Sequence, residues 1–330
     1  MAKFIYPKFG PLNPIYQRVL NSFPGGVQMA FAYGSGVFKQ QGQTDVKQNM
    51  MDFIFVVDSP YTWHQENLKQ NSHHYSSLKR FGPAVISAIQ ESSAGLYFNP
   101  MVPFEDRLIK YGVISNRLMA GDLMHWQSLY VSGRLHKPVM MIKHPEDPAA
   151  NEALKVNLRS AVHMSLLLLP DKFSEMELFT KIASLSYTGD IRMSFGEDQY
   201  KVNNIVNASL DNFRILYKPI LSDIAYLHWD NTKKCFEQEY SYSARRYHLD
   251  FVPVTVLTKI TRYDVDTLDG MRNTLAKDTE CNIALQESLE EIVNNSSKKQ
   301  SFKGIFTGGV FRSSKYGASK FKKWLNSRNK

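Results

Sequence analysis

Residues 27–38, VQMAFAYGSGVF, contain the first pattern that could do chemistry. An apolar run that predicts a strand ends at Gly34, Ser35 and Gly36. The two glycines leave backbone N–H groups open to a ligand, and N–H groups arranged in this way bind phosphate. The same triplet is compatible with a plain turn at the end of a strand. A phosphate site therefore needs a second reactive group nearby.

An acidic residue opens the next apolar run. Asp52 precedes FIFVV, which is rich in β-branched and aromatic residues and predicts a strand over 52–57. An acid at the first position of such a strand lies at the rim of the sheet, where a metal ion can reach it. A capping or turn role for Asp52 is the alternative.

A lysine interrupts a third apolar segment, RLIKYGVIS at 107–115. Lys110 would be costly inside a strand unless an opposite charge or an anionic ligand pairs with it. We therefore expect Lys110 to contact a phosphate.

Strands and helices alternate in the first part of the chain. Apolar runs predict strands, and apolar spacing predicts helices between them. The strands are expected at 27–33, 52–57, 94–100 and 107–115, and the helices at 61–71, 83–90 and 116–130. This alternation predicts a mixed sheet with flanking helices.

The segment KHPEDPAAN at 143–151 marks a boundary, after which the pattern becomes helical. Ser174 and Glu177 form a capping-box sequence at the start of one helix. Helices are expected at 152–169, 175–185 and 202–217, with a short strand pair at 186–202. No element is placed in 228–262, which shows little periodicity.

The glycine turn followed by an acid on the next strand resembles the nucleotidyltransferase superfamily of the DNA polymerase β type. Several segments are similar, more narrowly, to the mitochondrial phosphatidate cytidylyltransferases, also called mitochondrial translocator assembly and maintenance proteins. These segments are FAYGSGVFKQQG, MMDFIFVVDSPYTWHQENLKQN, HHYSSLKRFGP, RLIKYGVIS, LYVSGRLHKPV, SYTGDIRM and KGIFTGGV. The resemblance is close over 30–217 and returns at 303–310.

The resemblance implies an α/β (α+β) fold with a polymerase-β-like mixed sheet and flanking helices. The helical pattern after 148 predicts a mainly helical second domain, and the charge and apolar spacing near the end predict a C-terminal amphipathic basic helix. The expected divisions are a nucleotidyltransferase domain at 1–148, a winged-helix-like helical domain at 149–227, a connecting region at 228–297 and a basic membrane-associating tail at 298–330.

The implied reaction joins CTP and phosphatidate to give CDP-diacylglycerol and pyrophosphate, for phosphatidylglycerol and cardiolipin synthesis. It would take place on the matrix side of the mitochondrial inner membrane, to which the protein would bind peripherally. Gly34, Ser35 and Gly36 would hold the β- and γ-phosphates, and Asp52 would hold Mg²⁺ or another divalent cation.

Only one acid of the superfamily's D-x-D pair is present, because Met50 and Ile54 stand two positions from Asp52. On the resemblance, Asp190 is the candidate for the second metal ligand and catalytic carboxylate. Asp190 and Arg192 could equally form a structural salt bridge.

Five further side chains are candidate CTP contacts. Lys69 and Lys79 could bind the triphosphate, although surface lysines on a solvated helix are more common. Tyr111 and Tyr187 could stack on cytosine, although most tyrosines pack in a core. Arg192 is a further candidate for contacting the nucleotide.

The positive charge is concentrated at the C-terminal end. The chain has 40 Lys and Arg against 31 Asp and Glu, and ten of the basic residues lie in 298–330, which contains no acid. Within 313–330, Ala318, Phe321 and Leu325 recur at helical spacing among lysines. We expect an interfacial helix on an anionic membrane, with a solvated tail as the alternative.

Two other functions remain open. An RNA-directed nucleotidyltransferase would use the basic tail on nucleic acid, but residues 1–297 carry a net charge of −1, which argues against nucleic-acid binding. A non-catalytic factor that maintains the inner-membrane protein translocator is the other possibility. Two cysteines in 330 residues indicate a reducing compartment.

Overall fold

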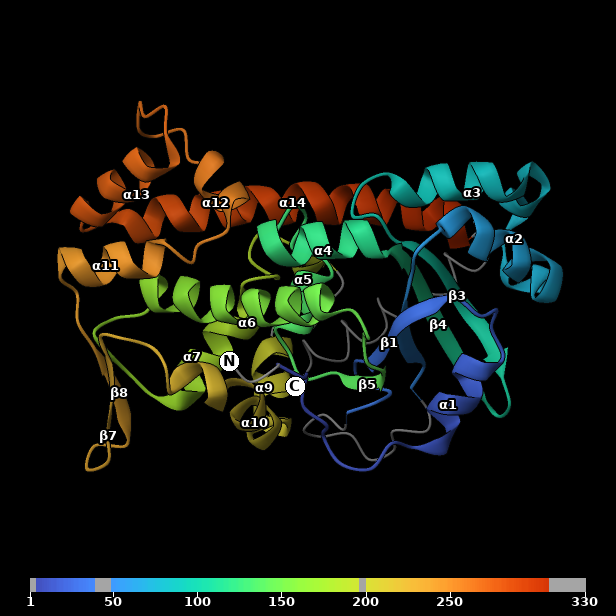
Figure 1. Cartoon of the computed structure of the whole chain (residues 1–330), viewed down its shortest axis with the longest axis horizontal. Helices are drawn as coiled ribbons and strands as arrows, with labels where there is room; N and C mark the ends of the chain where they lie inside the picture. Colours follow the sequence, from blue (N-terminus) through green and yellow to red (C-terminus); the bar gives the residue numbers. More distant parts are fainter. Residues whose placement is uncertain (1–3, 39–48, 196–199, 309–330) are drawn as a thin grey trace.

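A five-stranded mixed sheet lies at one end of the molecule, and helices extend from it toward the other end (Figure 1). The computed structural model describes residues 4–38, 49–195 and 200–308. The sheet order is β3-β4-β2-β1-β5, in which β2 and β4 are parallel and the other neighbours are antiparallel. Its strands are β1 (Val27–Tyr33), β2 (Met51–Val57), β3 (Tyr97–Phe104), β4 (Arg107–Ser115) and β5 (Met140–Lys143). The expected mixed sheet with flanking helices is confirmed.

The two faces of this sheet are covered by different helices, because side chains alternate along each strand. Phe53, Phe55 and Tyr111 pack on one face with α1 (Pro14–Asn21) and Trp63 of α2 (Pro60–Gln70). On the other face, Phe31 and Ile54 belong to the core that includes α4 (Asn116–His125) and α6 (Pro148–Leu168). Helix α3 (Gly82–Glu91) contacts β3.

The helix expected over 116–130 is shorter than predicted. It ends at His125 because Trp126 adopts a left-handed conformation, with φ of +53°. The buried Asp122 carboxylate then accepts hydrogen bonds from the backbone N–H groups of Ser128, Leu129, Val131 and Ser132, and from both serine hydroxyls. This carboxylate holds a loop in place of the last helical turn, and α5 (Ser132–Leu135) follows the loop.

The strand pair expected at 186–202 is wrong for the described residues of that segment. The chain leaves α7 (Glu175–Ser184) through turns in which Tyr187 N donates to Ser184 O and Asp190 N donates to Tyr187 O. Gly189, with φ of +75°, changes the direction of the chain before α8 (Ile191–Phe195) begins. The capping box of Ser174 and Glu177 at the start of α7 is confirmed.

Regular elements occupy much of the region in which the sequence placed none. A small antiparallel sheet joins β6 (Lys172–Phe173), β8 (Cys235–Gln238) and β7 (Leu227–Asp230). The remaining helices are α9 (Lys201–Ala208), α10 (Leu210–Leu221), α11 (Tyr242–Leu249), α12 (Val254–Thr258), α13 (Leu268–Lys277) and α14 (Cys281–Gly308). The short hairpin strands explain why no periodic pattern was visible.

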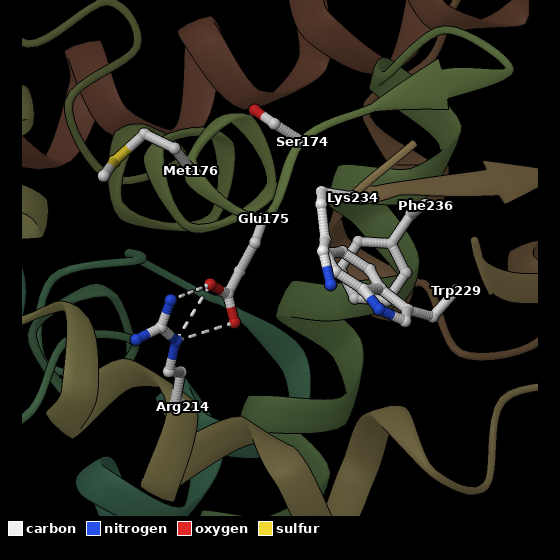
Figure 2. A pocket seen from close by; sticks show the side chains of 7 residues that line it. All are labelled: Ser174, Glu175, Met176, Arg214, Trp229, Lys234 and Phe236. Carbon is white, nitrogen blue, oxygen red and sulfur yellow. Dashed lines mark hydrogen bonds and ion pairs between the residues drawn. The ribbon is translucent and has the colours of Figure 1, made fainter. Parts of the chain in front are cut away.

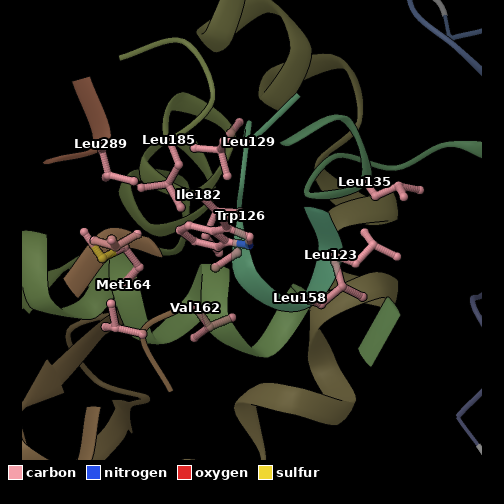
Figure 3. Close-up of a cluster of buried hydrophobic side chains, with 14 of the residues drawn as sticks. Leu123, Trp126, Leu129, Leu135, Leu158, Val162, Met164, Ile182, Leu185 and Leu289 are labelled. Atoms are coloured by element: carbon pink, nitrogen blue, oxygen red, sulfur yellow. The ribbon is translucent and has the colours of Figure 1, made fainter. Parts of the chain in front are cut away.

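One hydrophobic core crosses the boundary expected at 148/149. Trp126 and Leu123 of the first part lie among Leu158, Ile182 and Leu289 of the later helices (Figure 3). The boundary expected at 298 lies within α14, which continues to Gly308. Residues 313–330, expected to form an interfacial helix, lie outside the described residues.

Among the described residues, no helix has both the length and the apolar character needed to cross a membrane.

Candidate active site

Tyr33, Asp52 and Lys110 form a row across three neighbouring strands. The register pairs Asp52 with Tyr33 on β1 and with Lys110 on β4, and paired residues share one face of a sheet. Lys110 Nζ lies 3.8 Å from Asp52 Oδ1, and these side chains are only 15% and 22% exposed. The structure thus brings together the acid and the lysine that the sequence singled out separately.

The glycine turn packs directly against the start of β2. Gly34 has φ of +82°, and a Cβ there would lie 3.2 Å from Asp52 Oδ2. A Cβ on Gly36 would lie 2.3 Å from the carbonyl oxygen of Met50. The N–H groups of Val37 and Phe38 both donate to Gly34 O at 3.0 Å and close the turn. Only glycine allows this approach, which places Gly34, Ser35 and Gly36 beside the Asp52 carboxylate.

Asp52 retains an oxygen that could bind a cation. Its Oδ1 is buried and has no hydrogen-bond partner within the described part of the chain. Among the described residues, no group of three His, Cys, Asp or Glu side chains forms a complete metal site. Mg²⁺ is commonly held by one or two carboxylates together with substrate phosphates and water. The Asp52 carboxylate therefore fits a magnesium ion that the substrate helps to bind.

Asp190 forms an ion pair with Arg192. Arg192 binds both of its carboxylate oxygens, with Nη2 to Oδ2 at 2.5 Å and Nε to Oδ1 at 3.0 Å. The backbone N–H of Arg192 also donates to Oδ1 at 2.9 Å. The Asp190 side chain is 2% exposed. The pair of Asp190 and Arg192 that the sequence suggested is therefore present, and a metal-binding role for Asp190 stays a prediction.

Arg134 of α5 lies near this row and is a candidate that the sequence reasoning missed. Its Cζ lies 4.0 Å from the ring centroid of Tyr130 and 5.2 Å from that of Tyr33, which pairs with Asp52. Arg134 Nη1 donates to the carbonyl of Tyr130 at 2.7 Å, while its buried Nε has no partner among the described residues. Two more cations lie near these rings. Lys110 Nζ is 4.3 Å from the ring centroid of Phe98, and Arg192 Cζ is 5.8 Å from that of Tyr130.

A second group of cations continues from α5 to the turn after α7. Lys137 Nζ donates to Ser186 Oγ at 2.9 Å and lies 4.7 Å from the ring centroid of Tyr187. Lys201 Nζ lies 5.1 Å from the same centroid. Gly133 permits this contact between segments, because a Cβ there would lie 2.1 Å from Ser186 Cβ. The two groups together form a cation cluster, which we define as Lys110, Arg134, Lys137, Arg192 and Lys201.

The cation cluster changes the pKa values of neighbouring groups. Burial alone would raise the pKa of Tyr130. The positive charges of Arg134, Arg192 and Lys110 outweigh this effect and lower the pKa to about 7. Burial, with the charges of Arg134 and Lys201, holds the pKa of Lys137 well below its usual value. The lowered pKa of Tyr130 indicates an excess of positive charge, which an anionic ligand would relieve.

Three predicted contacts lie away from Asp52. Tyr111 is fully buried on the opposite face of the sheet, and its hydroxyl is hydrogen-bonded to Asn67 and Asn99. Lys69 lies on α2, which covers that opposite face, and pairs with Glu66 at 2.8 Å. The exposed Lys79 donates to the carbonyl of Ser72 at 3.4 Å.

A separate cavity of about 490 Å³ lies between α7, α10 and the β7–β8 hairpin (Figure 2). Arg214 reaches it but is bound by Glu175, with Nη2 to Oε2 at 2.6 Å, and by Asp211. None of the predicted site residues lines this cavity, whose lining residues are Ser174, Glu175, Met176, Arg214, Trp229, Lys234 and Phe236. Its one arginine is paired with two carboxylates, those of Glu175 and Asp211.

The fold and the site define a class of protein, an α/β protein in which a glycine turn lies beside a paired acid and lysine on neighbouring strands. The model of the family "Phosphatidate cytidylyltransferase, mitochondrial" matches residues 16–323. Relatives with that name include one from Danio rerio, 45% identical over 325 residues and covering 96% of each chain. One from Xenopus laevis is 42% identical, covering 94% of this chain and 95% of its own. One from Schizosaccharomyces pombe is 38% identical, covering 94% and 84%. The chain belongs to the family of mitochondrial phosphatidate cytidylyltransferases.

Proposed function

We propose that the chain transfers a cytidylyl group from CTP to phosphatidate, forming CDP-diacylglycerol and pyrophosphate. The observation that carries this proposal is the match of nearly the whole chain to relatives that bear the name of this activity. Because those relatives are named mitochondrial, we place the reaction in mitochondria. We also propose that it takes place at the matrix side of the inner membrane, where its product would feed phosphatidylglycerol and cardiolipin synthesis.

The reaction forms a bond between a phosphate oxygen of the lipid and the α-phosphorus of CTP. The bond between that phosphorus and the oxygen bridging to the β-phosphate breaks, and pyrophosphate leaves with the bonding electrons. A phosphate monoester is already ionised at neutral pH, so no strong general base is needed. Because both reactants are anions, neutralising and positioning their charges is the main task of the site.

The glycine turn and Asp52 would bind the triphosphate end of CTP. The backbone N–H groups of Gly34, Ser35 and Gly36 would donate to the β- and γ-phosphates, and the Ser35 hydroxyl could add one hydrogen bond. Asp52 would hold Mg²⁺ together with phosphate oxygens, and the ion would supply charge neutralisation when bound.

The cation cluster would bind the rest of the negative charge. Lys110 pairs with Asp52, and Arg134 lies near Tyr33 of the same row. These two cations would stabilise the transferring phosphoryl group and the attacking lipid phosphate. Asp190 would act as a positioning residue that orients Arg192. Lys137 and Lys201 both lie near the ring of Tyr187, so we assign that end of the cluster to phosphate rather than to stacked cytosine.

The experiment supplies CTP labelled in the cytidine moiety to the purified chain with magnesium and phosphatidate vesicles, and in parallel with tRNA. We expect the label in CDP-diacylglycerol and none in the RNA. Label in tRNA alone would favour an RNA-directed enzyme. No incorporation into either acceptor, from a folded chain, would favour a non-catalytic maintenance factor.

A further inference from the structure

The Lys110 ammonium lies against an aromatic ring as well as beside the Asp52 carboxylate. Its Nζ is 4.3 Å from the ring centroid of Phe98, a residue of β3, and 3.8 Å from Asp52 Oδ1. An ammonium over the face of a phenyl ring is attracted by the negative charge of that face. The Lys110 side chain is only 15% exposed, so water screens this attraction little. Groups from the two strands beside β4 therefore hold one ammonium.

Gly112 makes the room that the Phe98 ring occupies. Phe98 pairs with Gly112 in the register of β3 and β4, and position 112 shares its face of the sheet with Lys110. A Cβ on Gly112 would lie 2.5 Å from Phe98 Cε1 and 2.9 Å from Ile54 Cδ1. Any side chain at position 112 would push the ring away. Glycine lets the ring lie across β4 and reach Lys110.

The pairing of β3 with β4 is irregular beside Lys110. The register shifts between Asn99 and Val102 of β3. Two residues of β3, Pro100 and Met101, therefore stand opposite the single residue Lys110 of β4, and Met101 has φ of +58°. An extra residue of this kind interrupts the ladder of backbone hydrogen bonds. The ladder alone thus does not fix β3 against Lys110.

Hydrogen bonds on the opposite face of the sheet join the two strands at this irregularity. Asn99 Nδ2 donates to the Tyr111 hydroxyl at 2.8 Å, and Asn67 Nδ2 of α2 donates to the same oxygen at 3.0 Å. All three of these side chains are fully buried. Asn99 directly follows Phe98 on β3, and Tyr111 directly follows Lys110 on β4. The bond on one face therefore fixes the spacing of ring and ammonium on the other.

We propose that Phe98 is a positioning residue that holds the Lys110 ammonium in place for cytidylyl transfer. The inference rests on the proposed function, in which Lys110 stabilises the transferring phosphoryl group. A lysine ammonium is a point charge on a flexible stem, so one carboxylate on one side does not fix its position. A ring restricts the ammonium without neutralising it, because the ring carries no net charge. The positive charge of Lys110 then remains available to phosphate.

Steady-state kinetics of Phe98→Leu with short-chain phosphatidate test the proposal. Leucine keeps an apolar side chain at this position but offers no ring face to the ammonium. We expect kcat to fall about tenfold or more while KM for CTP changes by less than about twofold, because a misplaced Lys110 weakens the transition state more than the bound substrate. Phe173→Leu is the matched control, since Phe173 is a buried phenylalanine of the small sheet. It should lose comparable stability and keep its kcat.

A double-mutant cycle separates the positioning of Lys110 from a loss of packing. If Phe98 acts through Lys110, adding Phe98→Leu to Lys110→Met should lower the residual kcat by less than about twofold. Gly112→Ala, whose Cβ displaces the ring, should repeat the effect of Phe98→Leu. The proposal would be overturned if Phe98→Leu had the same kcat as Phe173→Leu, or if its loss were equally large in the Lys110→Met background.

The contact can also be tested without catalysis, by NMR of the chain labelled at its lysine side chains. The ring current of Phe98 should shift the ε-methylene proton signals of Lys110, assigned by their loss in Lys110→Met, upfield of other lysines. In Gly112→Ala these signals should return toward the ordinary range. Ordinary Lys110 signals in the wild type would overturn the positioning role of Phe98. A wild type without cytidylyl transfer would instead contradict the proposed function, and the NMR result would still decide the contact.

Discussion

Within the glycine turn, Gly36 has the least room for a side chain. In Gly36→Ala the new Cβ would meet the Met50 carbonyl oxygen, so the turn must move away from the start of β2. We expect a loss of stability of about 1 to 3 kcal/mol and a clear loss of CTP affinity. Thermal unfolding and calorimetric titration with CTP measure the two effects.

Gly25→Ala is the matched control, because a Cβ there meets nothing within 4 Å. It should leave both quantities unchanged. If Gly36→Ala bound CTP like the wild type, the glycine turn would not be the phosphate site.

Tyr130 should report the charge of the cation cluster. Its folded-state pKa of about 7 lies below the ordinary value of 10.0, so the phenolate contributes stability fully above pH 10. That contribution is lost as the pH falls toward 7. The ultraviolet absorbance of tyrosinate should show a titration near pH 7 that is absent in Tyr130→Phe.

Pyrophosphate should raise this pKa, because its negative charge would offset the cations that lower it. We expect a shift of about one pH unit or more. A titration curve indifferent to pyrophosphate would mean that the anion binds elsewhere.

Single residues differ in how far the sequence predicted their place. Asp52 and Lys110 were predictable, because a charge in an apolar strand requires a partner. Tyr111 follows Lys110 in β4, so the pleat turns it to the opposite face, and the sequence alone did not say which of the two faces carries the site. Arg134 belongs to a short helix after an irregular loop, and no periodic pattern marked it.

At the scale of elements, the loop from Trp126 to Val131 positions Tyr130 and, just beyond it, Arg134. The Asp122 carboxylate accepts hydrogen bonds from the backbone N–H groups of Ser128, Leu129 and Val131 in this loop and of Ser132 just beyond it. In Asp122→Asn, the amide nitrogen would face N–H groups that need an acceptor. We expect a loss of about 2 to 4 kcal/mol in unfolding free energy and reduced turnover below the unfolding temperature.

Chemical denaturation and the cytidylyl-transfer assay would check this expectation. Asp106→Asn, at an exposed position on the β3–β4 turn, controls for loss of a negative charge and should have little effect. Equal stability of Asp122→Asn and the wild type would contradict the role given to this carboxylate.

Elements with strong local signals were predictable, whereas elements defined by long-range contacts were not. The bounds of β1 and β4 match the expected 27–33 and 107–115, because both strands are apolar runs with clear ends. The end of α4 depends on the Asp122 carboxylate, which binds backbone N–H groups six or more residues further along the chain. The polar side chains Gln300 and Lys303 of α14 are buried against carbonyl groups of Leu96, just before β3, and of Gln90 in α3.

At the scale of the whole molecule, one core joins parts that the sequence divided at 148/149. Trp126 packs in this core, and its Nε1 donates to Asn157 of α6 at 2.9 Å. We expect residues 4–308 to unfold in a single cooperative transition, with equal calorimetric and van't Hoff enthalpies. Two separated transitions in scanning calorimetry, or a stable 1–148 fragment after limited proteolysis, would contradict this.

The central claim is that this chain moves the cytidylyl group of CTP onto phosphatidate at the Asp52 site. The most direct measurement uses CTP labelled either at the α-phosphorus or at the γ-phosphorus, with short-chain phosphatidate and magnesium. The account predicts that only the α label enters the lipid, that the γ label leaves in pyrophosphate, and that Asp52→Asn abolishes both while its thermal unfolding stays near that of the wild type. Entry of the γ label into the lipid, or near-wild-type transfer by Asp52→Asn, would contradict it.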